Sequence, residues 1–218
     1  VTCLQVSHTF SHFHNGSSTH AFEHMGCHPE QRQGKDGFVF RFDNSYDEKA
    51  EPFGFVKVWQ ISEYTLDPNR EILEHVQFCH EITYVIAGKG TFYSNGVPMK
   101  LQPGDVHMIA KGVEHRIVPA ERSNLRFANI GFEFSDKLPE EFRPIRKMFE
   151  EHKFLKLEDK GEIRLLITQL INEMYAKTAQ SHLMAECYIK LILAHTFRLT
   201  ETEKPKMFST KKLTAARL

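Results

Sequence analysis

Two short blocks of glycine and polar residues in the middle of the chain constrain its fold more than any other feature. Their members combine turn-forming glycines with side chains that can line a pocket: His75, Gln77, Glu81, Gly88, Gly104, Gly112 and His115. Between the blocks, Asn95-Gly96 separates two runs rich in β-branched and aromatic residues. Asn-Gly signals a two-residue hairpin because both residues tolerate positive φ. Residues two apart on a strand face the same way, so His75 and Gln77 can point into one shared space.

The pattern between residues 53 and 134 predicts a series of short strands, because apolar residues recur with a period of two. One face of the first strand is expected to carry Phe53, Phe55, Lys57, Trp59 and Ile61, and the other face Val56, Val58 and Gln60. Short strands at even spacing are typical of a sandwich or barrel that is closed by antiparallel pairing.

After residue 135 the period changes to 3.6, which predicts helices. Residues 138–151 are expected to be helical, with a kink or a fresh start at Pro144. Two amphipathic helices are expected over residues 162–200. The second carries two apolar stripes, one with Leu183, Cys187, Leu191 and Ala194, the other with Ile189, Leu193 and Phe197. A helix with two stripes needs cover on two sides, from its neighbour helix and from either the barrel or a second chain.

The two blocks resemble the two sequence motifs of the cupin family, over about residues 55–135. The first motif is G-x5-H-x-H-x3,4-E-x6-G, and Gln77 stands here in place of the second histidine. The second is G-x5-P-x-G-x2-H-x3-N, and here Ala110 replaces the proline and Pro119 the asparagine. The resemblance implies a mainly β fold with C-terminal α structure: a double-stranded β-helix (jelly-roll) barrel followed by an antiparallel helical pair.

The cupin resemblance leaves the chemistry of the barrel open. A divalent metal could be held by His75, Glu81 and His115, with open positions for a substrate. Because an amide takes the place of one imidazole, two alternatives stand beside the metal site. One is an organic-ligand pocket lined by His75, Gln77, Glu81 and His115, and the other is a purely structural set of hydrogen bonds. Trp59 could stack on a sugar-like ligand or fill the core. His107 could join the pocket, but a surface position is expected for it.

Three longer stretches, residues 80–90, 101–106 and 109–115, resemble the N-terminal sensor domain of AraC-type transcription regulators. With the paired helices the resemblance covers about residues 53–200. It implies a small effector, often a sugar or related metabolite, bound in the barrel, and a homodimer through residues 162–200. Regulators of this type also carry a DNA-binding half with paired helix-turn-helix motifs. DNA contact is therefore expected only through a domain missing from this chain.

Composition sets outer limits on function. The chain has 28 basic and 28 acidic residues, so no global positive field would draw it to nucleic acid or a membrane. No run approaches the roughly 18 apolar residues of a membrane span, and no secretory signal is visible, so a cytoplasmic location is expected. The four cysteines form no Cys-x-x-Cys pair, and Cys79 and Cys187 are expected to be small buried hydrophobic residues.

Four parts are expected along the chain: an irregular His-rich arm (1–50), a cupin effector-binding barrel (51–135), a helical dimerisation region (136–203) and a basic tail or truncated linker (204–218). The function predicted from these features is the effector-binding and dimerisation module of an AraC-type regulator that senses a small, sugar-like metabolite and requires no cofactor. The alternative is a metal-dependent cupin enzyme of the isomerase or dioxygenase type, so enzymatic activity is left open.

Overall fold

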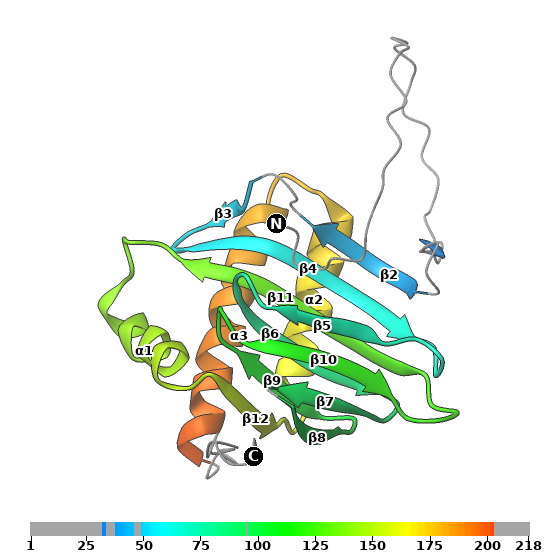
Figure 1. Ribbon diagram of the computed structural model, residues 1–218. Helices are drawn as coiled ribbons and strands as arrows, with labels where there is room; N and C mark the ends of the chain where they lie inside the picture. The colour runs from blue at the N-terminus through cyan, green and yellow to red at the C-terminus, as the bar shows by residue number, and fades with distance from the viewer. Residues whose placement is uncertain (1–31, 34–37, 46–48, 95, 203–218) are drawn as a thin grey trace, which may run out of the picture.

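Two antiparallel β-sheets form the body of the part that the computed structural model describes, which is residues 32–33, 38–45, 49–94 and 96–202 (Figure 1). The larger sheet has the order β1 (Arg32–Gln33), β2 (Phe38–Ser45), β4 (Val56–Leu66), β11 (Leu125–Phe134), β6 (His80–Ala87), β9 (Asp105–Ile109) and β12 (Phe154–Glu158), with β3 (Glu51–Phe53) also paired to β4. The smaller sheet has the order β5 (Ile72–Val76), β10 (Glu114–Pro119), β7 (Gly90–Ser94) and β8 (Val97–Leu101).

Tight turns join the strands where the sequence predicts them. β7 and β8 pair from Ser94 opposite Val97, which confirms the hairpin expected at Asn95-Gly96. The turn into β9 has Pro103 and Gly104 at its centre, and Gly104 has a φ of +93°. The amide of Asp105 closes this turn by donating to the carbonyl of Gln102 (3.1 Å). Glycine suits the third position of such a turn because φ is positive there.

A bulge in β4 changes which residues face which side of the larger sheet. Gly131 of β11 lies opposite Gln60, but the next residue, Phe132, lies opposite Val58, so Trp59 is the extra residue. Val58 before the bulge and Ile61 after it therefore belong to the same apolar cluster. The strict alternation expected for residues 53–61 is wrong for this reason.

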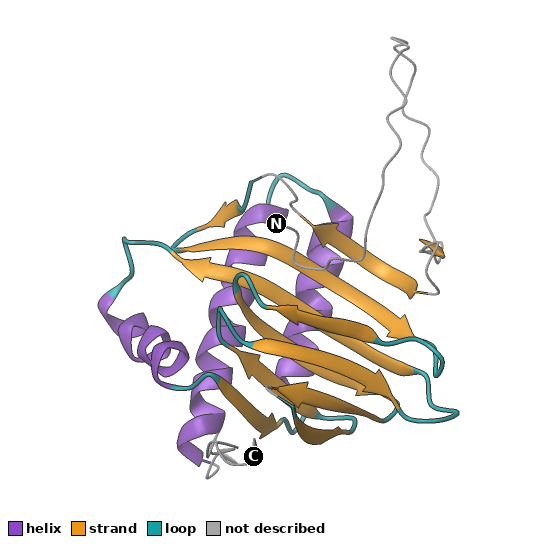
Figure 2. Cartoon of the chain, viewed as in Figure 1, coloured by secondary structure: helices purple, strands orange, loops and turns teal. Residues whose placement is uncertain are grey.

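Helices cover the outer face of the larger sheet, and Figure 2 shows the two long ones running behind the strands. They are α1 (Arg143–Glu151), preceded by the 3₁₀ turn η1 (Glu140–Phe142), α2 (Glu162–Ala176) and α3 (Ser181–Thr202). Pro144 lies in the first turn of α1, so it marks the fresh start that the sequence allows. One buried cluster joins the sheet to the helices; its members include Ile82, Tyr84, Met108, Ile130, Ile167, Ile189 and Leu193.

Only one of the two apolar stripes of α3 is covered. Ile189 and Leu193 are buried against the sheet, whereas Leu183 and Leu191 are 61% and 44% exposed. Cys187 lies on the uncovered stripe and is exposed, so the prediction that it is buried is wrong, while Cys79 is buried as predicted.

Two segments extend the larger sheet beyond residues 51–135. β2, which overlaps the first short strand that the sequence predicts at residues 37–42 within the arm, pairs along β4, from Phe38 opposite Leu66 to Ser45 opposite Gln60. β12, within the stretch expected to be helical, pairs with β9. Leu155 and Leu157 of β12 are buried and alternate with polar residues, which is the period of a strand covered on one face. The rest of the expected arm and tail lies outside the described residues.

Candidate ligand-binding site

The space between the two sheets has an apolar end and a polar end. The apolar end joins residues of both sheets in one buried cluster that includes Tyr64, Leu66, Val85, Phe92, Met99, Ile117 and Phe127. The polar end is lined on the larger sheet by Gln60, Ser62, Glu81, Thr83 and Asn129, all buried. We call these five residues the polar patch. Ser62 lies opposite Asn129, and Asn129 opposite Thr83, so the patch is continuous across three strands.

Glu81 is the centre of the hydrogen bonds in the polar patch. Its Oε1 accepts from the hydroxyl of Thr83 (2.6 Å), and its Oε2 accepts from the amide groups of Gln77 (3.2 Å) and Asn129 (3.2 Å). Burial raises the pKa of the Glu81 carboxyl, and these three hydrogen bonds and the charge of His75 act in the opposite direction. Asn129 in turn accepts from the hydroxyl of Ser62, and Ser62 accepts from the amide of Gln60 (3.2 Å).

Gln77 connects the two sequence blocks. Its backbone amide donates to the carbonyl of Val113 (2.9 Å), and its carbonyl accepts from the amide of Gly112 (2.6 Å). Gly112 has a φ of +85°, which suits glycine at this turn. Because its side chain donates to Glu81, Gln77 ties the turn before β10 to the polar patch on the larger sheet.

His75 and His115 lie opposite each other on β5 and β10 of the smaller sheet. Their ring centroids are 4.3 Å apart, and His115 also stacks on Phe92 (5.1 Å, 14° between planes). The Nδ1 atoms face backbone carbonyls, Leu73 for His75 (2.9 Å) and Val113 for His115 (3.4 Å). Since a carbonyl only accepts, Nδ1 carries the proton in each ring, and in the neutral form Nε2 is left as an acceptor. Burial, and secondarily the charge of His75, lowers the pKa of His115 to about 3.

His107 lies inside the protein, and its expected surface position is wrong. It is 1% exposed and lies between Phe92 and Phe154, with ring centroids 5.5 Å and 5.4 Å away. Burial lowers its pKa to about 3, and the positive charges of Lys156 and His115 act in the same direction. All five residues of β9 are buried, because one face meets the helices and the other faces the smaller sheet.

The predicted site residues therefore fall into three groups. Gln77 and Glu81 are bonded to each other within one network, and His75 and His115 form a contacting pair on the facing sheet. Trp59 is only partly buried and makes an edge contact with Phe78 (5.3 Å), the residue after Gln77. The residues share a region of the barrel, and their role in ligand binding stays a prediction.

Comparison with known proteins places this arrangement in a family. Residues 67–193, more than half of the chain, match the family described as the AraC-like ligand binding domain. The chain belongs to the AraC-like ligand-binding domain family. The match runs from the turn before β5 into α3, so it contains both histidines, Gln77, Glu81 and both long helices. A comparison with curated proteins found no match.

Solved cupin structures are similar to parts of this AraC-like domain. A predicted oxalate decarboxylase from Thermotoga maritima is 24% identical, with 35% of this chain and 67% of that chain covered and a TM-score of 0.33. A Cupin 2 conserved barrel protein from Salinispora arenicola is 16% identical (52% and 90% covered, TM-score 0.38). An RmlC-like cupin with a double-stranded β-helix fold from Methanocaldococcus jannaschii is 16% identical (51% and 94% covered, TM-score 0.36). Independently of these similarities, the family match, the two antiparallel sheets and the C-terminal helices confirm the mainly β fold with C-terminal α structure that the sequence predicts.

A metal ion finds no ready set of ligands in the described part of this AraC-like domain. No three His, Cys, Asp or Glu side chains there are grouped closely enough to hold one. A metal bound by His75, Glu81 and His115 would therefore require these side chains to move. The metal site therefore stays a prediction.

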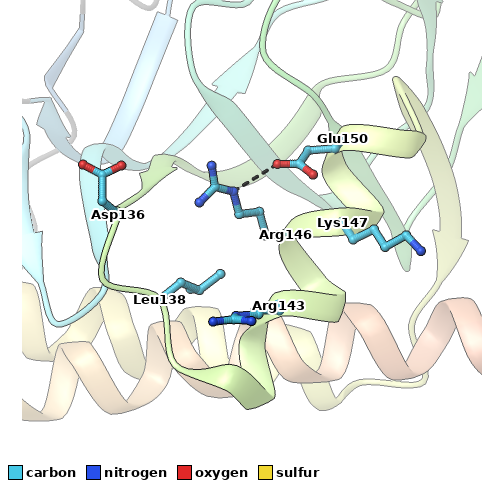
Figure 3. A pocket seen from close by; sticks show the side chains of 6 residues that line it. All are labelled: Asp136, Leu138, Arg143, Arg146, Lys147 and Glu150. Carbon is cyan, nitrogen blue, oxygen red and sulfur yellow. Dashed lines mark hydrogen bonds and ion pairs between the residues drawn. The ribbon is translucent and has the colours of Figure 1, made fainter.

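A surface hollow of about 450 Å³ lies away from the polar patch, beside α1 (Figure 3). It is lined by Asp136, Leu138, Arg143, Arg146, Lys147 and Glu150. Arg143 pairs with Glu140 (3.0 Å), Arg146 with Glu150 (3.0 Å) and Lys147 with Glu151 (3.4 Å). Because these cations are already paired, the hollow offers no excess charge to a ligand.

Most of the polar patch is not predicted from the sequence. Gln60, Ser62, Thr83 and Asn129 were not identified, although each is a polar residue at an inward position of an otherwise apolar strand. Thr83 follows Glu81 by two residues, so alternation alone could have found it. Gln60 and Ser62 were obscured by the bulge at Trp59.

No helix in the described residues is both long and apolar enough to span a membrane.

Proposed function

We propose that the chain is the effector-binding and dimerisation module of an AraC-type transcription regulator, and that it binds a small metabolite at the polar end of the space between its sheets. The observation that carries this proposal is the continuous family match, which spans the barrel strands and both long helices. In this reading Gln77, Glu81, His75 and His115 contact the ligand, with Trp59 at the edge of the site. DNA is contacted by a separate domain.

The chemistry of the site favours a ligand rich in hydrogen-bond donors. Glu81 offers carboxylate oxygens, and the rings of His75 and His115, whose Nδ1 atoms face backbone carbonyls, turn Nε2 to a ligand. Phe92 adds an aromatic surface behind His115. Acceptors beside an aromatic wall suit a polyhydroxylated, sugar-like metabolite, whose hydroxyls donate and whose C–H faces stack.

Strand β6 supplies a physical route from ligand to helices. Glu81 and Thr83 face the inter-sheet space, while Ile82 and Tyr84, which alternate with them, pack in the cluster that joins the sheet to α2 and α3. A ligand that binds one arrangement of β6 better shifts the population toward that arrangement. The shift would alter how the helices sit and thus the geometry of a dimer.

The uncovered face of the helices supports the dimerisation part of the proposal. It carries exposed apolar side chains: Leu165, Leu183, Met184 and Leu191. Apolar patches of this kind on amphipathic helices commonly mark protein interfaces. A second copy of the chain would cover the stripe of α3 that the barrel leaves open.

The proposal is tested by thermal unfolding of the full chain with a panel of neutral monosaccharides, amino sugars, sugar acids and amino alcohols. A binding compound raises the melting temperature in proportion to its concentration. Thr83→Val should weaken the binding of that compound. Thr91→Val, on the outward face of the smaller sheet, should leave the binding unchanged. Metal analysis separates the enzyme alternative: stoichiometric iron, manganese, nickel or zinc that is lost in His115→Ala would favour it. A cytoplasmic location stays a prediction.

A further inference from the structure

A glycine interrupts the polar patch at a position flanked by two acceptors. Gly131 of β11 lies opposite Gln60 of β4 on one side and opposite Glu81 of β6 on the other. Residues directly opposite in a sheet share a face, so all three point toward the smaller sheet. The backbones of β4 and β6 are roughly 10 Å apart across β11, and no side chain rises from the sheet between Gln60 and Glu81.

Both flanking side chains have acceptor capacity left. Glu81 Oε1 accepts one hydrogen bond, from Thr83, so one of its lone pairs is unused by the described residues. Gln60 is 1% exposed, and its Oε1 has no hydrogen-bond partner among the described residues, while its Nε2 donates to Ser62. A buried acceptor without a donor is costly, which makes Gln60 a group that a ligand could satisfy.

No Lys or Arg among the described residues compensates the charge of this position, although the charge of His75 acts to lower the pKa of the Glu81 carboxyl. The hydrogen bonds to Glu81 all come from neutral donors, namely Thr83, Gln77 and Asn129. Three donors on two oxygens favour the ionised form of this carboxyl, against the burial that raises its pKa. No Lys or Arg in the described part of the chain forms an ion pair with Glu81.

We propose that the space over Gly131 is a subsite for a positively charged amine, so that the effector is an organic ammonium compound, such as an amino sugar or amino alcohol, in place of a neutral sugar. The ammonium group donates to Glu81 Oε1 and to Gln60 Oε1, and the rest of the ligand extends toward His75 and His115. This inference rests on the proposed function and names the ligand class for the same site.

Gly131 has a second structural reason to be glycine, because it borders the bulge at Trp59. The two reasons can be separated by experiment. Gly131 is not among the glycines with positive φ, so its φ is one that an alanine can adopt. Gly131→Ala therefore places a methyl group in the subsite without forcing a left-handed conformation.

The test uses matched pairs of probes that differ only in an amine for a hydroxyl: glucosamine and glucose, galactosamine and galactose, and ethanolamine and ethylene glycol. Dissociation constants are measured by calorimetric titration of the full chain at neutral pH. The amine of at least one pair should bind about tenfold or more tightly than its hydroxyl partner, because a hydrogen bond to a charged group is the stronger one. Glu81→Gln, which keeps the shape of the side chain, should abolish the preference.

Two further variants complete the design. Gly131→Ala should weaken the binding of the amine about tenfold or more, while the free energy of unfolding changes little. Glu63→Gln is the matched control, since it removes a carboxylate of β4 that is paired with Arg126 on the other face, and it should leave the preference intact. Neutral sugars that bind as well as their amines would overturn the subsite and leave the sensing function standing. The subsite would also be overturned if the preference for the amine survives Glu81→Gln. The same holds if neither member of any pair binds.

Discussion

Asn129 on β11 donates a side-chain hydrogen bond to Glu81 on the neighbouring strand β6, with 3.2 Å between Nδ2 and Oε2. This contact puts an amide, and not a second acid, beside a buried carboxylate. Asn129→Asp keeps the shape and replaces the donor by a carboxylate oxygen. We expect the free energy of unfolding at pH 7 to fall by about 2–4 kcal/mol, because a donor is lost and like charges are buried together.

The loss should be partly relieved at pH 5. Two adjacent carboxyls have raised pKa values in the folded protein, so lowering the pH protonates one of them there before it does so in the unfolded chain. Urea unfolding at the two pH values measures the effect. Asn124→Asp, at an exposed position, is the control and should change stability by less than about 0.5 kcal/mol. Equal losses for both variants would contradict the role of the Glu81 contact.

Gly88, the last residue of the first block, is required by close backbone packing. It has a φ of +82°, and a Cβ there would lie 2.0 Å from the carbonyl oxygen of Asn124. Gly96 also has positive φ (+76°), but a Cβ there would meet nothing within 4 Å. Gly96→Ala should therefore cost about 1–2 kcal/mol of left-handed strain. Gly88→Ala should cost clearly more, about 3 kcal/mol or above, because backbone must also move.

Urea midpoints of the two variants test this difference directly. The same change is made at two left-handed glycines, so the conformational term is common to both, and the remainder reports the clash with Asn124. Comparable midpoints for Gly88→Ala and Gly96→Ala would show that the contact is relieved at little cost.

Local signals predicted the parts of the fold that depend on local chemistry. The hairpin at Asn95-Gly96, the fresh start at Pro144 and the switch to helices follow from turn geometry and periodicity, and the structure confirms them. The contact between Gln77 and Glu81 joins residues only four apart, so spacing could suggest it.

The features that the sequence did not predict depend on tertiary context. The bulge at Trp59 is a mismatch between β4 and β11, which no single strand encodes. His107 was misplaced because β9 is covered on both faces, so polarity no longer marks the outward side. The sequence predicts Cys187 to be buried because an apolar stripe has the same sequence pattern whether the barrel or another molecule covers it.

His107 should make stability depend on acid. Burial lowers its pKa to about 3, whereas a histidine in the unfolded chain titrates near 6.5. Between these values the unfolded chain binds the proton and the folded protein does not, so the free energy of unfolding falls as the pH is lowered from 6.5 toward 3. The loss approaches about 1.4 kcal/mol per pH unit for one histidine.

The contribution of His107 is isolated by His107→Gln, which cannot titrate. Although the variant is less stable at pH 7, its free energy of unfolding should fall by about 2 kcal/mol less than that of the parent between pH 6 and pH 4. The part that remains includes His115, whose pKa is also lowered to about 3. Parallel pH dependence in the parent and the variant would show that His107 takes up its proton without unfolding.

The exposed stripe of α3 should control association. Leu183 and Leu191 lie eight residues apart on the face that the barrel leaves uncovered, and they are 61% and 44% exposed. Leu183→Glu with Leu191→Glu would place two charges in a dimer interface, so sedimentation should show a monomer with unchanged circular dichroism. Leu73→Glu is the control, since Leu73 is 66% exposed on β5, away from the helices. If the double variant sediments like the parent, a dimer does not use this stripe, and the helix pair would need another role in the module.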